Sequence, residues 1–582
     1  MSIPLKQYWT LLIDYLRPER LKAVLLGALL FANIGLQLLN PQIMRSFIDS
    51  ALGGAPLEAL MRFALLFIAI DLATQGFRVG ATYVGQDVGW STTNRLREDL
   101  ARHCLGLDLA FYRDRPPGEL IERIDGDVTA LSNFFSQFVI QVLGSGLLLI
   151  GTLALLFRED WRVGLALSLF AGLSLVILGQ ARELAVPHQR EERQASAQLF
   201  GFLEERLTGL EDIRANGAGP YAMRRFHERM RDLFRRGRKA ILMRSVVWLL
   251  TMGLFTVGNA LTLGMGAYLF LSGSITIGTV YLFFQYTQML QGPLEQITDQ
   301  LQDLQRAGAS IQRIQELQAI QGQVKDGAGA SLPTGALPVE FAKVSFAYAD
   351  EAERPVLQNI SFRLAPGRIL GILGRTGSGK TTLSRLLFRF YDPTGGEILL
   401  GEDTRRTRRR DLRQRVALVT QDVQLFSASV RDNLTLFDRS IPDARILAVV
   451  EELGLPEWFA NLPEGLDTRL DAGGAGLSAG EAQLLAFVRV FLRDPGLVIL
   501  DEASSRLDPA TERLIENAVG RLLRGRTGMI IAHRLATVQR ADEILILEDG
   551  RIREHGPRAR LAGDPSSRFA QLLHAGMEEA LA

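Results

Sequence analysis

The sequence predicts an all-α transmembrane domain of six helices followed by an α/β domain of the P-loop class. Three observations lead to this prediction. Long apolar segments crowd into the first half of the chain, whereas in the second half short apolar runs alternate with segments of helical periodicity. In that second half, a glycine-rich loop of the pattern G-x-x-x-x-G-K-[ST] lies between a strand-like run and a helical segment. At 582 residues, the chain is long enough for two or three domains.

Composition narrows the possible functions. The 65 Lys and Arg residues nearly balance the 64 Asp and Glu residues, and a net charge of +1 gives no global reason to expect a nucleic-acid partner. Cys104 is the single cysteine, which excludes an internal disulfide and a cysteine-type zinc site. Residues 1–20 are charged and lack a long apolar core, so we expect an amphipathic elbow helix on the cytosolic membrane surface rather than a cleaved signal peptide.

Six segments are apolar over the ~20 residues that a helix needs to cross a bilayer: 21–48, 57–84, 134–157, 161–184, 241–271 and 275–294. The last segment is the least apolar, because glutamines interrupt it. The short loops between spans carry at most one basic residue, whereas the long loops 85–133 and 185–240 carry many. The positive-inside rule therefore predicts a multi-pass protein of the inner (plasma) membrane, with the long loops and both termini in the cytosol.

The two long loops have a pattern of their own. Residues 95–111 and 191–216 show helical periodicity with abundant charge, so we expect the membrane helices to continue well beyond the bilayer. Prolines and a glycine at 116–118 break the first loop, and a second break occurs at 216–220. We expect a compact turn at each break, suited to docking onto the domain that follows.

Polar side chains within the expected spans form two groups. Asp71, Gln75 and Arg78 fall at i, i+4 and i+7 on one helical face. An intramembrane carboxylate is costly, so this face either borders a functional cavity or bonds a neighbouring helix, and the sequence leaves both interpretations open. The other group is expected to consist of packing residues: Asn33, Gln37, Gln141 and Asn259.

The glycine-rich loop predicts a phosphate site. Its glycines let successive backbone N–H groups turn towards a polyphosphate at the positive end of the following helix. Lys380 would reach the β- and γ-phosphates, and the Thr381 hydroxyl would bind Mg²⁺. The loop residues expected to contact the nucleotide are Gly374, Thr376, Gly377, Ser378, Gly379, Lys380, Thr381 and Thr382.

A mostly polar stretch at 316–338, rich in Gly and Ala, predicts a linker between a transmembrane domain at 1–315 and an α/β domain at 339–582. Within the α/β domain, an apolar run at 497–500 reads as a buried strand. This strand would deliver Asp501 to its carboxyl end, where the carboxylate can bind Mg²⁺. Glu502 can then orient or deprotonate an attacking water.

Residues 477–483, Leu-Ser-Ala-Gly-Glu-Ala-Gln, resemble the signature sequence of ATP-binding cassette (ABC) proteins, and the whole chain resembles an ABC exporter half-transporter. The resemblance implies ATP and Mg²⁺ as ligands, and a cassette dimer in which Ser478 and Gly480 of one subunit face the Lys380 loop of the other. The turns at 112–119 and 212–221 resemble the coupling helices of such exporters. The remaining implied roles are adenine stacking by Tyr348, sensing of Mg²⁺ and the attacking water by Gln421, a dimer-interface loop containing Asp508, and γ-phosphate contact by His533.

The chain departs from the family's usual Leu-Ser-Gly-Gly-Gln signature at two positions. Ala479 adds a methyl group where backbone approaches phosphate, and Glu481 places a negative charge near the expected triphosphate. At ~6 Å and an effective dielectric of ~20, two like charges repel by about 3 kcal/mol. Because this chain's own catalytic residues are intact, we favour a heterodimer with a second half-transporter of standard signature over a homodimer.

The arginine run at 405–410 is expected to be a solvated face, or to contact acidic lipid or the membrane domain, rather than nucleic acid. The sequence as a whole predicts ATP-driven export or flipping of an amphipathic drug, lipid or peptide by alternating access, with membrane lipids as further partners. An ATP-gated channel or regulatory ABC protein with little turnover is the main alternative, and a soluble ATPase acting on DNA or the ribosome is a third. The intact Glu502 and His533 favour the pump, and no motif identifies the cargo.

Overall fold

The structure is a computed structural model that describes residues 17–113, 115–349, 354–420, 423–471, 477–501, 509–532 and 538–575. The chain divides into two compact units. The helical unit comprises Met1–Gly106 and Pro116–Ile320, and the α/β unit comprises Leu107–Arg115 and Gln321–Ala582. A short segment from the first half of the chain therefore belongs to the α/β unit.

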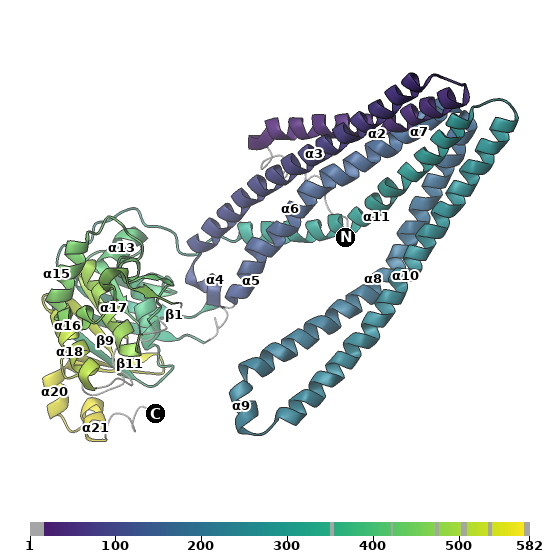
Figure 1. Ribbon diagram of the computed structural model, residues 1–582. Helices are drawn as coiled ribbons and strands as arrows, with labels where there is room; N and C mark the ends of the chain where they lie inside the picture. The colour runs from purple at the N-terminus through teal and green to yellow at the C-terminus, as the bar shows by residue number, and fades with distance from the viewer. Residues whose placement is uncertain are drawn as a thin grey trace. The chain divides into compact units, whose positions relative to one another are not determined.

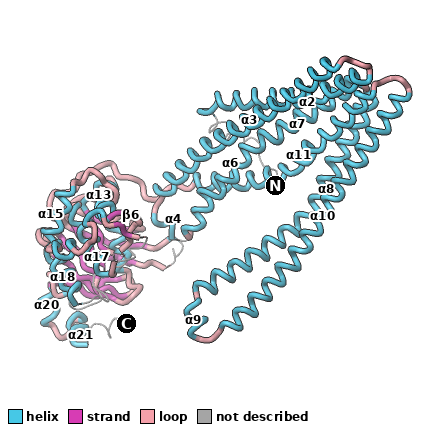
Figure 2. Tube along the Cα trace, viewed as in Figure 1, coloured by secondary structure: helices cyan, strands magenta, loops and turns pink. Residues whose placement is uncertain are grey.

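The described part of the helical unit contains helices and no strand, as Figures 1 and 2 show. Its long helices are α2 Arg20–Leu52, α3 Leu57–Gly106, α6 Asp127–Gln137, α7 Gly144–Glu159, α8 Trp161–Thr208, α10 Gly219–Leu271 and α11 Ile277–Ala319. Its short helices and helical turns are η1 Arg17–Glu19, α5 Pro117–Ile121, η2 Glu122–Gly126, η3 Phe138–Leu143 and α9 Leu210–Ala215, of which η2 and η3 are π-helical.

All six expected membrane spans lie on helices, which confirms the predicted helical transmembrane fold. Among the described residues, four helices are long and apolar enough to cross a membrane: Arg17–Leu52, Gln141–Glu159, Trp161–Thr208 and Gly219–Leu271. The expected spans 57–84 and 275–294 lie on α3 and α11, whose sequences contain more polar residues.

Three helices are much longer than a membrane crossing requires. α3, α8 and α10 have 50, 48 and 53 residues. At 1.5 Å per residue, each is about 75 Å long, more than twice the ~30 Å hydrocarbon core. α8 and α10 lie side by side and are joined through α9 (Figure 1). The Asp160 carboxylate begins α8 by accepting hydrogen bonds from the amides of Arg162 and Val163.

Close packing in this unit relies on a small residue and on buried hydroxyl groups. Phe170 of α8 packs edge-on against Phe255 of α10, and a Cβ at Gly258 would lie 2.6 Å from the Phe170 ring. Only glycine therefore allows this approach. Between α10 and α11, the Thr262 and Thr287 hydroxyls are hydrogen-bonded at 2.9 Å. Such bonds join helices whose surroundings offer no water as an alternative partner.

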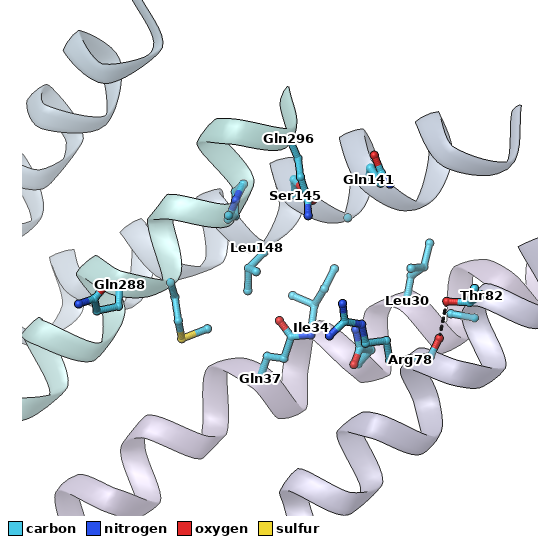
Figure 3. A pocket seen from close by; sticks show the side chains of 16 residues that line it. Leu30, Ile34, Gln37, Arg78, Thr82, Gln141, Ser145, Leu148, Gln288 and Gln296 are labelled. Atoms are coloured by element: carbon cyan, nitrogen blue, oxygen red, sulfur yellow. Dashed lines mark hydrogen bonds between the residues drawn. The ribbon is translucent and has the colours of Figure 1, made fainter. Parts of the chain in front are cut away.

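Several of the polar residues predicted from the sequence meet at a cavity between helices (Figure 3). Arg78 lines this cavity, whereas Asp71 and Gln75 do not. Asn33, Gln37 and Gln141, expected to be packing residues, also line it. The sequence could not distinguish these roles, because helical periodicity does not specify which neighbouring helix a face meets.

The described part of the α/β unit contains three sheets. β2 Leu357–Leu364, β1 Val339–Phe346 and β4 Gly395–Leu399 form an antiparallel sheet in that order. The six-stranded sheet has the order β11 Arg551–Pro557, β10 Glu543–Glu548, β3 Ile369–Gly374, β9 Thr527–Ile531, β8 Leu497–Asp501 and β5 Val416–Val419, parallel except for β11. β6 Ala428–Ser429 pairs with β7 Arg469–Leu470.

Helices cover both faces of the six-stranded sheet, among them α12 Lys380–Leu387 and α17 Ala479–Leu492. The other described helices of this unit are α4 Leu109–Arg113, α13 Arg409–Arg415, α14 Val430–Thr435, α15 Asp443–Leu453, α16 Pro456–Ala460, α18 Pro509–Leu523, α20 Arg558–Gly563 and α21 Arg568–Ala575, with a 3₁₀ turn η5 at Gly465–Asp467. On β8, Leu497 and Ile499 join the core that contains α12, while Val498 and Leu500 join the core that contains α17. The strand is apolar throughout because both faces of its sheet are buried.

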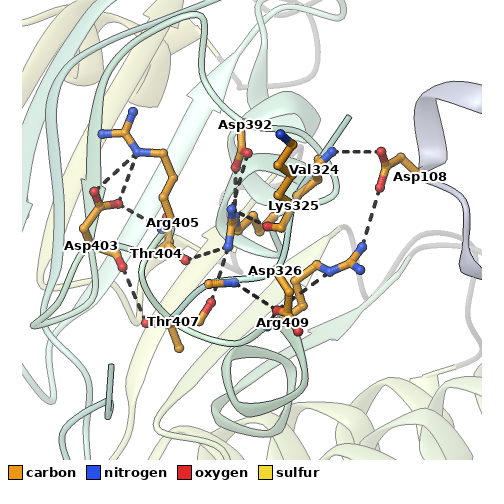
Figure 4. Close-up of polar contacts among 12 residues, drawn as sticks. Asp108, Val324, Lys325, Asp326, Asp392, Asp403, Thr404, Arg405, Thr407 and Arg409 are labelled. Carbon is orange, nitrogen blue, oxygen red and sulfur yellow. Dashed lines mark hydrogen bonds and ion pairs between the residues drawn. The ribbon is translucent and has the colours of Figure 1, made fainter. Parts of the chain in front are cut away.

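The segment Leu107–Arg115 packs within the α/β unit through a buried carboxylate (Figure 4). The Asp108 carboxylate accepts a hydrogen bond of 2.9 Å from the Val324 amide and pairs with Arg409 at 3.6 Å. Asp108 is 8% exposed. Burial strengthens these charge-assisted contacts, because water competes little for the carboxylate.

The stretch that follows α11 is fastened to the arginine run. Arg406 O accepts hydrogen bonds from the amides of Gly329 and Ala330, and the Asp326 carboxylate accepts one from the Arg409 amide. That amide holds the pKa of Asp326 below its usual range. The guanidinium of Arg389, 4% exposed as a side chain, pairs with Asp392 and donates to Lys325 O. Arg406 and Arg409 of the arginine run therefore bind the linker. The number of like charges in the run could not predict this role.

Candidate active site

The glycine-rich loop adopts backbone conformations that require its glycines. Gly374, Gly377 and Gly379 have φ values of 154°, 83° and 103°. A Cβ at Gly374 would lie 2.4 Å from Leu547 O, and one at Gly379 would lie 2.6 Å from a Leu357 methyl group. Because β3 ends at Gly374 and α12 begins at Lys380, the loop leads from a buried strand into a helix N-terminus. This is the geometry that directs amide groups and the helix dipole at an anion.

Side chains in the loop fit a phosphate ligand. The Lys380 ammonium donates to Gly374 O at 2.6 Å and to Arg375 O at 2.9 Å, so the cation lies over the loop itself. Within the described part of the chain, the buried Ser378 hydroxyl has no hydrogen-bond partner. A buried polar atom without a partner is costly, and phosphate oxygens would supply the missing acceptor.

The register of the sheet brings Asp501 to the same edge as this loop. β3 and β8 flank β9, and Ile531 of β9 pairs with both Ile372 and Asp501. Adjacent strands are ~4.8 Å apart, so the β3 and β8 backbones are about 10 Å apart at this level. A carboxylate and the Thr381 hydroxyl at one sheet edge are ligands that suit Mg²⁺. Among the described residues, no cluster of three or more His, Cys, Asp or Glu side chains forms a metal site.

Tyr348 lies in an aromatic cluster, and its ring faces a cation. It is 9% exposed, with Phe346 and Tyr391 packed edge-on against it. The Arg113 guanidinium lies 4.2 Å above the ring centre. These residues border a cavity of about 450 Å³.

The Tyr348 hydroxyl connects this cluster with the first turn of α12. It is hydrogen-bonded to Thr382 Oγ1 at 3.2 Å and accepts from Arg385 at 3.1 Å. The Tyr348 ring is thus bonded to the helix that follows the phosphate loop.

The altered signature forms a helix cap. Ser478 is the N-cap of α17, and its hydroxyl accepts from the Glu481 amide at 3.3 Å. The Glu481 carboxylate accepts from the Ser478 amide at 2.8 Å and from the Trp458 indole N–H at 3.2 Å. Gly480 lies buried in the first turn. The carboxylate expected to repel a triphosphate is therefore held by two donors of this chain, a capping box that the sequence pattern S-x-x-E could have predicted.

Four predicted site residues lie outside the described residues: Gln421, Glu502, Asp508 and His533. In contrast, two residues that sequence reasoning did not select, Arg113 and Asp108, prove central. Each is contributed by a loop more than two hundred residues before its contacts, so no local motif could identify it.

Comparison with known proteins covers both units. Residues 24–294 match the family model described as the ABC transporter transmembrane region, and residues 357–505 match the model described as ABC transporter. The ABC transporter ATP-binding protein YfiC of Bacillus subtilis, uncharacterized by its name, is 30% identical over 561 residues, which cover 96% of this chain and 92% of the relative.

Two further likenesses concern exporters. A Staphylococcus aureus protein provisionally named a multidrug export ATP-binding/permease protein is 30% identical over 567 residues, which cover 94% of this chain and 96% of that protein. The structure of a bacterial Atm1-family ABC exporter with ATP bound matches with a TM-score of 0.79, covering 96% of this chain and 98% of that chain. Its identity is 23%, so this likeness concerns the fold.

The capping box yields a prediction. Glu481→Ala removes the acceptors of Ser478 N–H and Trp458 Nε1–H, so the first turn of α17 loses about 1 kcal/mol. We expect hydrogen exchange of residues in this turn to quicken about fivefold. Glu481→Gln keeps one acceptor and should have a smaller effect. Glu457→Ala, an exposed acidic residue of the neighbouring α16, is the control. Unchanged exchange in Glu481→Ala would mean that the carboxylate does not hold the cap.

Proposed function

Because the chain belongs to the ABC transporter family, as an exporter half-transporter whose cassette hydrolyses ATP coupled to transport, we propose that it moves a small amphipathic cargo out of the cytosol by alternating access. One observation carries this proposal: the same chain contains a transmembrane helical unit and a glycine-rich loop shaped to bind phosphate. We place the protein in the inner membrane with its cassette in the cytosol, since the basic residues gather in the long loops.

In the proposed reaction, the residues at the edge of the six-stranded sheet have different roles. The loop amides, Lys380 and the Ser378 hydroxyl hold the phosphates of ATP, and Thr381 with Asp501 holds Mg²⁺ together with Gln421. Mg²⁺ would neutralise phosphate charge during phosphoryl transfer. Glu502 accepts a proton from the attacking water, and His533 contacts the γ-phosphate. Asp508, Ser478 and Gly480 act across the cassette dimer.

The Arg113 guanidinium provides a route by which nucleotide binding reaches the helical half. Adenine would stack on the Tyr348 ring, whose face the Arg113 guanidinium covers, and a stacked base contributes about 1–3 kcal/mol. Adenine and Arg113 therefore compete for the Tyr348 ring. Since Arg113 belongs to the Leu107–Arg115 segment, its release changes the contacts of a segment that is covalently joined to α3.

A gated channel or regulatory protein would use the same nucleotide contacts without steady hydrolysis. The presence of both Glu502 and His533 in the sequence favours the pump, because a switch driven by binding alone does not need a general base.

Replacing the general base separates these functions. Glu502→Gln keeps the size and hydrogen bonding of the side chain but cannot accept the proton. We expect steady ATP hydrolysis to fall about 10²–10⁴-fold with ATP binding retained, measured on the purified assembly in lipid nanodiscs. Transport should stop in parallel. Transport that continues at the parent rate in this variant would favour gating by binding alone.

The altered signature also bears on the partner. In a homodimer, both ATP sites would face Ala479 and Glu481, whereas a partner with the standard signature would complete the catalytic half that this chain supplies. The capping box shows that this signature folds into a defined helix start, and it leaves a carboxylate where the family has an amide. We therefore favour a heterodimer with a second half-transporter.

The dimer composition can be tested with the chain alone. We expect the homodimer to hydrolyse ATP slowly, and the double substitution Ala479→Gly with Glu481→Gln to raise its rate about tenfold or more, since each tenfold corresponds to 1.4 kcal/mol. Ala482→Gly, in the same turn but outside the altered positions, serves as the control. Brisk hydrolysis by the unmodified homodimer, with no gain from the double substitution, would reverse the preference for a heterodimer.

A further inference from the structure

The cavity in the helical unit has a volume of about 480 Å³ and is bordered by α2, α3, η3, α7 and α11. Its polar lining is unusual for a space between membrane helices: Gln37 lies on α2, Gln141 on η3, and Gln288 and Gln296 on α11. Figure 3 shows the side chains of Gln37, Arg78 and Gln296 around one central space. A volume of this size lies within the ~300–1,000 Å³ of pockets that hold small organic ligands.

Charge in this cavity has one sign. Arg78 is the one charged residue among the described residues that line it. Within the described part of the chain, no ion pair joins Arg78 to a carboxylate, and Asp71 on the same helix does not border the cavity. A cation enclosed between membrane helices is costly unless an anion or water compensates it. The cavity therefore offers an uncompensated positive site.

A second, independent observation also indicates a ligand. Asn33 lines the cavity and is 8% exposed, and its Oδ1 has no hydrogen-bond partner among the residues that the structure describes. A buried acceptor without a donor costs free energy until a ligand supplies an N–H or O–H group. Nearby, the Ser145 hydroxyl donates to Gln296 Oε1 at 2.6 Å and so orients that amide.

The depth of these residues suits a charged ligand that enters from the cytosol. Arg78 lies about 30 Å along α3 from Leu57, and Asn33 lies about 30 Å along α2 from Leu52. Both are therefore about one hydrocarbon thickness away from the short loop between these helices, near the opposite boundary of the bilayer. An anion can reach this level without crossing the apolar centre first.

We propose that this cavity binds an organic anion, with a carboxylate or phosphate against Arg78 and an N–H or O–H donor to Asn33. The forked guanidinium matches the two oxygens of such a group, and the glutamine amides accommodate further polar atoms. Leu30, Ile34 and Met289 offer apolar contact for the remainder. The inference rests on the proposed export function and adds the cargo class: a small amphipathic anion, which the cavity prefers to a lipophilic cation because a cation would meet Arg78.

Binding without nucleotide tests this proposal separately from the pump. The purified full-length assembly in phosphatidylcholine nanodiscs is titrated with a panel of N-acyl dipeptides, each as its carboxylate and as its neutral carboxamide, and binding is followed by calorimetry and thermal shift. We expect the tightest-binding carboxylates to exceed their amides about tenfold or more. Arg78→Met should abolish that preference, and Arg62→Met, on the same helix but outside the cavity lining, should retain it.

A second variant and a second lipid complete the test. Arg78→Lys keeps the positive charge but lacks the forked guanidinium, so we expect a weaker preference for carboxylates over amides. This variant tests the proposal if Arg78→Met does not fold. Adding phosphatidylglycerol to the nanodiscs distinguishes the source of the anion. If this lipid alone raises the melting temperature of the assembly in a way that depends on Arg78, the site binds a lipid headgroup. If the soluble carboxylates raise it, the site binds a soluble anion.

Equal binding of carboxylates and amides, with no Arg78-dependent effect of the anionic lipid, would overturn the anion site even if ATP hydrolysis is normal. Loss of ATP hydrolysis with anion binding intact would instead count against the pump alone.

Discussion

The Asp108 carboxylate holds a piece of the membrane-helix half of the chain inside the α/β unit. It accepts from the Val324 amide and pairs with Arg409, and it is almost fully buried. Removing one partner of a buried, charge-assisted contact leaves the other desolvated without compensation, so such a contact resists separation. Because the Leu107–Arg115 segment continues directly from α3, any rearrangement of the cassette around this contact acts on the end of a helix about 75 Å long. The proposed conversion of ATP binding into helix movement depends on this attachment.

Two levels of preorganisation support that conversion. The backbone of the phosphate loop is shaped for an anion, because its glycines adopt φ values that other residues rarely adopt. In addition, the Ser378 hydroxyl has no hydrogen-bond partner among the described residues. Next to it, Tyr348 connects α12 to Arg113 through its hydroxyl and its ring. In the proposed mechanism, the nucleotide shifts the population towards whichever arrangement of these side chains it binds more tightly. Arg389 and Asp326 hold the linker to the α/β unit, through Lys325 O and the Arg409 amide. Arg409 also pairs with Asp108, so the linker and the Leu107–Arg115 segment are bound in one region of that unit.

Sequence reasoning predicted what depends on local pattern. Apolar spans, the extension of α3, α8 and α10, the strand before Asp501 and the loop before Lys380 follow from periodicity and turn chemistry. What it could not predict depends on partners distant in the chain. Glu481 was expected to act on a triphosphate, yet Trp458, 23 residues earlier, helps to hold its carboxylate. The arginine run was expected to face solvent, lipid or the membrane domain, yet the backbone of Gly329 and Ala330 binds it. The cavity around Arg78 draws residues from helices more than two hundred positions apart, so amides that look like packing residues in sequence line a ligand-sized space.

The most direct test follows the helical unit while the cassette turns over. Spin labels at Leu105→Cys on α3 and Met230→Cys on α10, in a Cys104→Ala background, report the distance between two exposed positions of the helical unit. In the parent assembly this distance should shift when ATP and Mg²⁺ are added. In Asp108→Ala the cassette should still hydrolyse ATP while the shift is lost, and Asp411→Ala, an exposed acidic residue of α13, should retain it. A full ATP-dependent shift in Asp108→Ala would contradict the claim that this buried carboxylate couples hydrolysis to the membrane helices.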